Sequence, residues 1–288
     1  MADPRPGPVL VTGANSGFGL AACLRLADRG WEVHGTVRSL AKAEGLKEQA
    51  REHGVAARIH PVVLDVSDHA ALVRAWPELP DFHAVVNNAG YSETGAVEEV
   101  SAERARAQLD VNLVAPAIVS ACALPAMRRR GDGRIVMVSS VAGRAAVLPL
   151  NGWYHASKFG LEALSDVLRV EVASFGVKVS IIEPGFFKTA IGEKIRDRTR
   201  RSDEDSPYAG AYERVQNLLG LVERLAPGPD VVARTIVTAI ESRRPRNRYV
   251  VGLDALTTIA SQPFVPREVT DWAMRLTSGL TGRGSGSR

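Results

Sequence analysis

Two side chains that could exchange protons, Tyr154 and Lys158, stand four residues apart in the segment NGWYHASKFG at 151–160. If this segment is helical, the two side chains lie on the same face, one turn apart. A phenol with a pKa of about 10 is ionised in roughly one molecule in a thousand at pH 7. An ammonium about 4 Å away, at an effective dielectric near 20, contributes on the order of 4 kcal/mol, or about three pKa units. The pair therefore predicts an acid–base catalyst, and the alternative is a surface pair without a chemical role.

A second segment, TGANSGFG at 12–19, has the composition of a phosphate-binding turn. Its glycines Gly13, Gly17 and Gly19 stand between an apolar run and an amphipathic stretch. Glycine permits a tight turn and lets a pyrophosphate approach the amides at a helix N-terminus. Glycine-rich turns occur in many α/β proteins, but the place of this one between the first strand and the first helix predicts dinucleotide binding.

Arg38 bears on the choice of dinucleotide. An NAD enzyme usually places an acid at the end of the second strand, where it bonds the ribose 2′-hydroxyl. Here Val37 stands in that place and Arg38 follows it. A guanidinium can bind a 2′-phosphate through two hydrogen bonds, and the hydroxyl of Ser39 could add a third. We therefore expect NADP(H) to be preferred, with NAD(H) possible; the alternative is a solvated arginine at a helix start.

Apolar runs alternate with amphipathic stretches along most of the chain. The predicted strands lie at 8–13, 31–37, 58–66, 82–90, 133–140, 177–185 and 248–252. The predicted helices lie at 17–29, 39–53, 101–130, 151–169 and 230–242, with a shorter one between the third and fourth strands. This alternation implies right-handed crossovers, and so an α/β fold with a doubly wound parallel sheet of about seven strands and helices on both faces. No linker interrupts the strands, which predicts a single domain over 1–288.

Composition restricts the classes of function. Hydrophobic residues make up 45% of the 288 and charged residues 24%, as in an ordinary globular protein. The net charge is +4, and acidic residues lie close to two of the three basic clusters, at 128–130, 196–201 and 243–248. We therefore expect no nucleic-acid partner, because such a role needs an uninterrupted basic face or a reading motif.

Cysteine and histidine spacing indicates neither a disulfide framework nor a metal site. Cys23 and Cys122 lie in apolar helical patterns, which is typical of buried thiols in a reducing cytoplasm. The six histidines show no ligand spacing, so no metal is expected. No uninterrupted run of 18 apolar residues occurs, so we expect no integral membrane segment, and the opening MADPRPGP is too polar for a signal peptide.

Five segments in register carry a family resemblance. They are TGxxxGxG at 12–19, NNAG at 87–90, the serines at 139–140, YxxxK at 154–158 and PGFFKT at 184–189. With them the chain resembles the single-domain branch of the short-chain dehydrogenase/reductase family, from Val9 to about Gly252. The resemblance implies a Rossmann sheet of seven strands and NAD(P)-dependent oxidation of an alcohol or reduction of a carbonyl. It also implies that Tyr154 donates or accepts the proton and that Lys158 holds the nicotinamide ribose.

The same resemblance suggests roles for further residues. Ser140 would donate a hydrogen bond to the substrate oxygen, although it precedes Tyr154 by fourteen positions, one more than the usual spacing. Aligning SSVAG favours Ser140 over Ser139. Asn112 would hold a water that links Lys158 to solvent; the alternative is a local bond to the backbone that kinks its helix. Asn87 would stabilise the end of its strand.

The predicted binding residues form two sets. Those for the cofactor are Gly13, Ser16, Gly17, Phe18, Gly19, Arg38, Ser39, Asp65, Val66, Asn87, Ala89, Gly90, Tyr154, Lys158, Pro184, Gly185, Phe187 and Thr189. Asp65 and Val66 would border the adenine, and Thr189 would meet the carboxamide. Those for the substrate are Ser140, Trp153, Tyr154 and Phe186. Phe187, Leu148 and Leu218 could extend an apolar pocket, although a core role is equally compatible with each.

The function expected from these residues is NADPH-dependent reduction of a lipophilic ketone or aldehyde, or oxidation of the matching alcohol. An NAD-linked hydroxysteroid-type dehydrogenase and a non-catalytic dinucleotide-sensing regulator are the alternatives. We expect a substrate lid at about 188–229 and an amphipathic C-terminal extension at about 253–288 that packs on the pocket or a neighbouring subunit, with membrane-surface contact as a lesser alternative. The resemblance further suggests a cytoplasmic homodimer or homotetramer.

Overall fold

A parallel sheet of seven strands forms the centre of the protein. The computed structural model describes residues 7–188 and 205–280. The strands are β1 (Pro8–Val11), β2 (Glu32–Val37), β3 (Ile59–Val63), β4 (Ala84–Asn87), β5 (Gly133–Val138), β6 (Val177–Pro184) and β7 (Arg248–Val251). Their order is β3-β2-β1-β4-β5-β6-β7, and every neighbouring pair is parallel. The chain order reverses between β1 and β4, and a doubly wound sheet binds its ligand at such a switch point.

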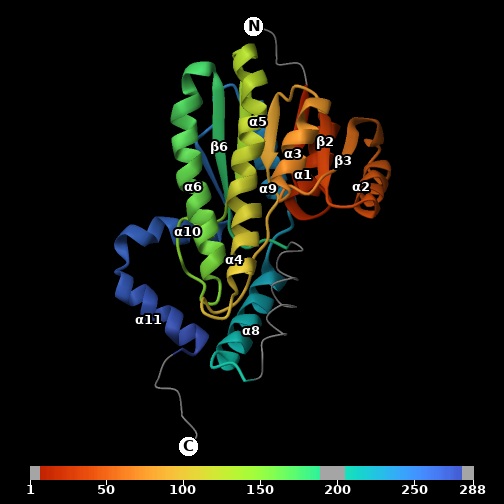
Figure 1. Ribbon diagram of the computed structural model, residues 1–288. Helices are drawn as coiled ribbons and strands as arrows, with labels where there is room; N and C mark the ends of the chain where they lie inside the picture. The colour runs from red at the N-terminus through yellow and green to blue at the C-terminus, as the bar shows by residue number, and fades with distance from the viewer. Residues whose placement is uncertain (1–6, 189–204, 281–288) are drawn as a thin grey trace, which may run out of the picture.

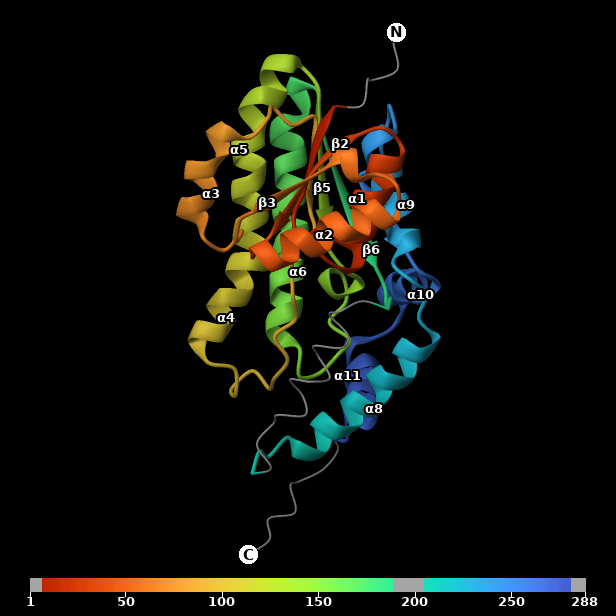
Figure 2. The same ribbon diagram turned by 90° about the vertical axis from the view of Figure 1, so that its right-hand side faces the viewer.

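Helices cover both faces of the sheet (Figures 1 and 2). One face carries α1 (Gly17–Asp28), α2 (Leu40–Glu52) and α9 (Asp230–Glu241); the other carries α3 (His69–Ala75), α5 (Ala115–Arg130) and α6 (Gly152–Val172). Successive strand residues point to opposite faces, so Val9 and Val11 pack against the first group and Leu10 against the second. This layering explains why the strands read as continuous apolar runs, and it confirms the predicted fold class.

Short helical turns connect these elements. The 3₁₀ turns are η1 (Ala56–Arg58), η2 (Trp76–Glu78), η4 (Val141–Gly143), η5 (Ala173–Phe175) and η6 (Gln262–Phe264). Two predicted strands end earlier than expected: 58–66 stops at Val63 and 82–90 stops at Asn87. Both segments continue into loops whose residues line a cavity instead of pairing in the sheet.

The helix predicted at 101–130 is continuous but not uniform. It begins as α4 (Ala102–Leu109), passes through a π-helical turn, η3 (Asp110–Val114), and continues as α5. Among the described residues, this stretch of 29 residues contains an 18-residue window of mean hydropathy 1.6, enough by length and composition to cross a membrane. The sequence expectation counted only uninterrupted apolar runs and missed this window. In the structure, Val119, Ala123 and Met127 pack against the sheet, which is the role of a core helix.

Beyond the carboxyl ends of the strands lie α8 (Ala209–Leu225), α10 (Leu253–Ser261) and α11 (Arg267–Ser278), with α8 and α11 in contact (Figure 2). A small separate core joins α8 to two loops through Ala96, Leu150, Tyr212 and Val215. The Tyr212 hydroxyl donates to Glu99 at 2.6 Å and accepts from the Ala96 amide at 2.8 Å. The second half of the predicted lid is therefore held on the loop after β4, whereas residues 189–204 lie outside the described part.

Candidate active site

A cavity of about 820 Å³ opens at the carboxyl ends of the central strands, on both sides of the switch point. Eleven predicted site residues line it: Gly13, Ser16, Gly17, Phe18, Arg38, Asp65, Val66, Ala89, Gly90, Tyr154 and Lys158. They come from six loops and helices between residues 13 and 158, so the fold brings together residues that are far apart in the chain. This volume lies within the usual range for a cofactor or ligand pocket.

The glycines after β1 shape one end of the cavity. Gly13 and Gly17 have φ of 69° and 54°, in the left-handed region where side chains are strained. A Cβ on Gly19 would lie inside van der Waals contact of the Gly13 carbonyl and 2.5 Å from Asn88 Nδ2, so a larger residue would push α1 off the loop. The predicted glycine pattern thus has a separate steric reason at each position.

The N-terminus of α1 points at the cavity with its amide groups available. Ser16 stands at the N-cap but, among the described residues, its side chain makes no capping hydrogen bond, and the first turn contains no acidic residue. Such an end combines unpaired N–H groups with the positive end of the helix dipole. It fits the pyrophosphate of a dinucleotide, which supports the phosphate-binding prediction on grounds independent of the glycine spacing.

Asn87 does not reach the cavity, and its neighbour Asn88 does. The Asn87 amide is buried beneath α5, where Nδ2 donates to Ser120 Oγ at 3.1 Å. Asn88 lines the cavity, and its Nδ2 donates to the Thr12 carbonyl at 2.9 Å and the Gly13 carbonyl at 3.3 Å. The strand alternation explains the difference, since Asn87 shares the α5 face with Val85. Sequence analysis missed Asn88, although the same alternation could have indicated it.

Arg38 lies exposed at the rim of the cavity, at the end of β2. Within the described residues its guanidinium makes no hydrogen bond or ion pair, so it is available to an anion. Ser39 instead caps α2, because its hydroxyl accepts a hydrogen bond from the Lys42 amide at 3.4 Å. Ser39 does not line the cavity, but Lys42, in the first turn of α2, does. Lys42 is a second cation at this rim that sequence analysis did not identify.

The loop after β3 forms the next part of the wall. Val66 is 6% exposed, and Asp65 Oδ1 accepts from the Ser67 amide at 3.0 Å and from its hydroxyl at 2.7 Å. These bonds fix the Asp65 carboxylate at the cavity edge, beside the position predicted for the adenine.

Tyr154 and Lys158 lie on the same face of α6, as their spacing predicts. The Ser140 hydroxyl is within hydrogen-bonding reach of the Tyr154 phenol. Lys158 Nζ lies 5.9 Å from the centre of the Tyr154 ring and donates to the Val138 carbonyl at 2.9 Å. Burial lowers the pKa of Lys158 to about 8, and the charge of Glu162 opposes that shift.

The expected lowering of the tyrosine pKa is wrong in this structure. Burial raises the pKa of Tyr154, and the hydrogen bond from Ser140 only partly opposes it. The physical reason is that desolvation penalises the phenolate, whereas the ammonium of Lys158 is directed at the Val138 carbonyl. The phenol therefore keeps its proton at neutral pH, the form that a proton donor requires.

Asn112 occupies the π-helical turn, and its side chain bonds to neighbouring segments. Its Oδ1 accepts from the Tyr91 amide at 3.0 Å, and its Nδ2 donates to the Tyr91 carbonyl at 2.9 Å and to Ser157 Oγ at 3.0 Å. The alternative that the sequence left open, a bond from the Asn112 side chain to the backbone of its own helix, is not found among the described residues. Asn112 ties the loop after β4 to α6, and π-helical turns are frequent at functional sites. Its water-holding role stays a prediction.

Ser139 and Ser140 point to different neighbours at the end of β5. Ser140 caps η4, its Oγ accepting from the Ala142 amide at 3.1 Å, and it reaches Tyr154. Ser139 is 4% exposed and lines the cavity, and its hydroxyl lies on the side of Glu162. The segment between Ser140 and Tyr154 contains Leu150, which has φ of 61°; it is the single non-glycine residue of the described chain in the left-handed region. Leu150 therefore lies in the segment that puts fourteen positions between Ser140 and Tyr154, one more than the usual spacing.

The segment after β6 does not line the cavity itself but contacts Phe18, which does. Phe187 packs edge to face on Phe18, with ring centres 5.7 Å apart, while Phe186 is 38% exposed. The Phe186 amide donates to Asp254 Oδ2 at 2.7 Å, and a Cβ on Gly185 would lie 2.5 Å from Asp254 Cγ. Asp254, in the first turn of α10, was missed by sequence analysis, although an acid three residues after the last strand was a usable signal.

Other predicted residues of this region lie at the edge of the site or outside the described part. Pro184 ends β6, and its carbonyl lies 3.5 Å from Ser140 Oγ. Trp153 is half-buried in the first turn of α6. Thr189 lies outside the described residues. Among those residues, no group of three or more His, Cys, Asp or Glu side chains could hold a metal ion.

The family model described as short chain dehydrogenase matches residues 8–200. The chain belongs to this family. Its members transfer hydride with a nicotinamide dinucleotide, and this chain is accordingly an NAD(P)-dependent oxidoreductase.

Several proteins resemble the chain over most of its length. It is 33% identical to an uncharacterized oxidoreductase, YusZ, of Bacillus subtilis, over 89% of this chain and 93% of that one. It is 32% identical to human retinol dehydrogenase 5, over 91% and 86%. A solved short-chain dehydrogenase/reductase from Burkholderia phymatum, in complex with NAD, has a TM-score of 0.77, 25% identity, and coverage of 92% and 95%. Other solved neighbours are complexes with NADP.

The two serines differ in contact, and their substitutions should differ in effect. We expect Ser140→Ala to lower kcat by about 10²-fold, because it removes a donor beside the Tyr154 phenol. Ser139→Ala should cost less than about tenfold, because its hydroxyl faces Glu162 instead. Steady-state kinetics of both variants with one substrate makes the comparison. The reverse order would show that the longer spacing shifts the catalytic role to Ser139.

The pKa of Lys158 predicts a limit on activity at high pH. Its ammonium is present below about pH 8 and is lost as the pH rises through that value, so kcat/KM should fall on the alkaline side. Loss of the Tyr154 proton does not account for such a fall, because burial raises the pKa of the phenol. The profile of kcat/KM from pH 6 to 10 measures it. A rate that stays constant to pH 10 would contradict the role of the ammonium.

Proposed function

We propose that this oxidoreductase is an NADPH-preferring carbonyl reductase whose substrate is a lipophilic ketone or aldehyde. The observation that supports the chemistry best is the contact between Ser140 and the Tyr154 phenol, with the buried ammonium of Lys158 on the same helix face. The observation that supports the cofactor is Arg38 at the cavity rim.

The cavity fits a nicotinamide dinucleotide. The uncapped end of α1 and the glycines at 13 and 17 would hold the pyrophosphate, and Asp65 with Val66 would border the adenine. Ala89 and Gly90 would lie against the ribose on the side of Lys158, and Phe187 and Pro184 would support the nicotinamide end. A bound nicotinamide supplies or accepts the hydride.

The proposed direction is reduction, in which the protonated phenol of Tyr154 serves as the acid. The phenol would donate this proton to the carbonyl oxygen as negative charge develops there, and the Ser140 hydroxyl would donate a second hydrogen bond to the same oxygen. Lys158 would hold the ribose and favour the phenolate that remains. Asn112, bonded to Ser157 on α6, would maintain the route by which the proton is replaced.

An apolar substrate is supported by the side chains around this end of the site. Phe186 and Leu218 are 38% and 40% exposed, and Trp153 is half-buried next to Tyr154. Leu148 and Phe187 are packed into core clusters, so we assign them a supporting role. The similarity to a retinol dehydrogenase also agrees with a lipophilic substrate. It equally favours the second candidate, an NAD-linked oxidation of a lipophilic alcohol such as a hydroxysteroid.

We also propose that the chain is one domain, works in the reducing cytoplasm and assembles as a homodimer or homotetramer. Its two cysteines are unpaired, and burial raises the pKa of the Cys23 thiol. On α6, Val167 and Val170 are 58% and 74% exposed, an apolar face that a second copy could cover.

Tyr154→Phe tests the proposed chemistry. The ring remains and the transferable proton is lost, so kcat should fall by about 10²–10⁴-fold or more, while NADPH affinity stays within a few-fold of the original. The measurement is NADPH oxidation with a panel of ketones and aldehydes, alongside a fluorescence titration of NADPH. Turnover near the original rate would end the assignment of Tyr154, and a panel in which only alcohols with NAD react would favour the second candidate.

Arg38→Ala tests the proposed cofactor preference. A 2′-phosphate carries nearly two negative charges, so we expect kcat/KM to favour NADPH over NADH by about ten- to several hundred-fold. The variant should lose most of that preference through a higher KM for NADPH. Val37→Asp should move the preference further toward NADH, because it adds an acceptor for the ribose hydroxyl and repels the phosphate.

Lys42→Ala is the matched comparison at the same rim. If the two cations share the phosphate, this variant should lose part of the preference and Arg38→Ala the larger part. Equal kcat/KM values for the two cofactors in the unmodified protein would contradict the proposed preference. Loss of both cofactors alike in Arg38→Ala would mean that the arginine holds the loop.

A further inference from the structure

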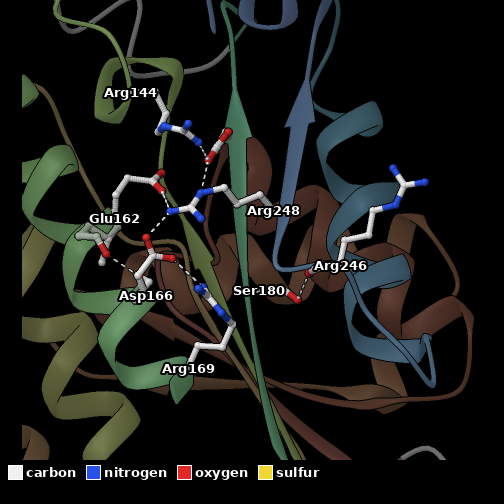
Figure 3. Close-up of polar contacts among 10 residues, drawn as sticks. Arg144, Glu162, Asp166, Arg169, Ser180, Arg246 and Arg248 are labelled. Atoms are coloured by element: carbon white, nitrogen blue, oxygen red, sulfur yellow. Dashed lines mark hydrogen bonds and ion pairs between the residues drawn. The ribbon is translucent and has the colours of Figure 1, made fainter. Parts of the chain in front are cut away.

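Two buried carboxylates lie behind the catalytic residues, and the proposed reaction uses neither. Glu162 on α6 is 5% exposed, and Glu183 on β6 is fully buried. Arg248, the first residue of β7, joins them: its Nη2 lies 3.2 Å from Glu162 Oε2 and its Nε 3.0 Å from Glu183 Oε1. Figure 3 shows the Arg248 guanidinium directed at α6. A buried carboxylate is costly, so such a cluster calls for a reason.

The place of Glu162 beside the catalytic pair suggests that reason. It follows Lys158 by one turn of α6, so the two side chains are neighbours on one helix face. Lys158 reaches the carbonyl of Val138, while Glu162 faces the next residue, Ser139. A Cβ on Gly143 would lie 2.7 Å from Ser139 Oγ and 3.0 Å from Glu162 Cγ, so the Glu162 side chain is packed tightly against the η4 turn.

The second carboxylate connects the same cluster to Ser140. Glu183 Oε1 accepts a hydrogen bond from Arg144 Nη1 at 3.0 Å, and Arg144 directly follows the η4 turn that Ser140 caps. Glu183 also precedes Pro184, whose carbonyl lies 3.5 Å from Ser140 Oγ. The cluster of Glu162, Glu183 and Arg248 thus contacts both the segment that carries Ser140 and the helix that carries Lys158.

A third acid on α6 has similar bonds but a different place. Asp166 follows Glu162 by one more turn, and its Oδ2 accepts from Arg248 Nη2 at 2.6 Å (Figure 3). Its Oδ1 accepts from Arg169 at 2.6 Å. Asp166 therefore shares the arginine with Glu162 while lying two turns from Lys158, which makes it a matched control.

We propose that Glu162, held in place by Arg248, is a positioning residue that supplies the counter-charge of the Lys158 ammonium. The Lys158 ammonium is buried, so its charge needs a partner other than water. The carboxylate of Glu162, one helical turn further along α6, is the acid placed to provide one. Without that charge, Lys158 would lose its proton at a lower pH. The placement of Lys158 itself rests on the proposed function; its ionisation can be measured without any substrate.

The charges around Glu162 define what the substitution should change. The groups that face it are Lys158 and Asp166 on α6, Ser139 after β5, Glu183 on β6 and Arg248 on β7. Burial raises the pKa of Glu162; the Ser139 hydroxyl opposes this, Glu183 adds to it, and Arg248 opposes it. The charge of Glu162 in turn raises the pKa of Lys158 against the effect of burial. Removing that charge should therefore shift the alkaline limit of activity to lower pH.

The experiment compares Glu162→Gln with Asp166→Asn. The chain has six lysines, so ¹³Cε-labelled lysine gives a spectrum in which Lys158 is assigned by its absence from Lys158→Met. We expect the Lys158 titration midpoint to fall by about half a pH unit or more in Glu162→Gln and to stay unchanged in Asp166→Asn. Thermal unfolding of each variant accompanies the titration.

A double variant, Glu162→Gln with Arg248→Gln, protects the test against misfolding. It removes Glu162 together with the arginine that it binds, while Glu183 keeps its ion pair with Arg144 and Asp166 its ion pair with Arg169. The Lys158 midpoint should fall in this variant as well, but by less than in Glu162→Gln, because the positive charge of Arg248 is removed together with the negative one. The kinetic profile of Glu162→Gln with NADPH and a ketone should lose activity at a correspondingly lower pH, with KM for the ketone within about twofold of the original.

The outcomes separate the possibilities. A lower Lys158 midpoint in the Glu162 variants alone supports the inference, whether or not any ketone is reduced. Midpoints that stay unchanged while both single variants melt at lower temperature would overturn it and leave the cluster a structural brace. Absence of turnover with every carbonyl, together with a shifted midpoint, would contradict the proposed function and leave the inference intact.

Discussion

The burial of one ammonium group constrains the rest of this site. Lys158 can remain on the inner face of α6 only if its charge meets partners in place of water, and the Val138 carbonyl provides one of them. That bond requires β5 to end beside the first turns of α6, and Gly143 permits the close approach. Tyr154 and Ser140 are then placed by the same two elements. Changes in how α6 lies on β5 would therefore alter all three functional groups together.

Much of the fold could be predicted because the apolar pattern leaves little freedom. Continuous runs such as Val9–Val11 suit strands buried on both faces, and the intervening helices make the parallel order necessary. The strand ends were harder, since Asn88 and Ala89 leave the sheet for the cavity without any change in composition. The π-helical turn at Asp110–Val114 was equally invisible, because it arises from packing on the loop at Tyr91.

The site was predictable where spacing dictates geometry and not where tertiary contacts decide it. Tyr154 and Lys158 share a face because of the helical repeat, and Gly13 and Gly17 have backbone conformations that favour glycine. Whether the pKa of Tyr154 is raised or lowered depends instead on how deeply this side chain is buried, and the spacing of residues in the sequence does not report burial. Asp254 belongs to the same category: it meets the Phe186 amide from a segment more than sixty residues further along the chain.

Arg248 and Asp254 are also synthesised later than the groups that they hold in place. A polypeptide leaves the ribosome from its N-terminus at about 5–20 residues per second, and early segments can pack before late ones exist. The glycine turn, Ser140, Tyr154 and Lys158 all emerge well before β7 and α10. Until those last elements dock, the carboxylates of Glu162 and Glu183 lack their shared arginine, and the Phe186 amide lacks its acceptor. A nascent chain can thus hold every reacting group and still await, for some seconds, the residues that lock them in place.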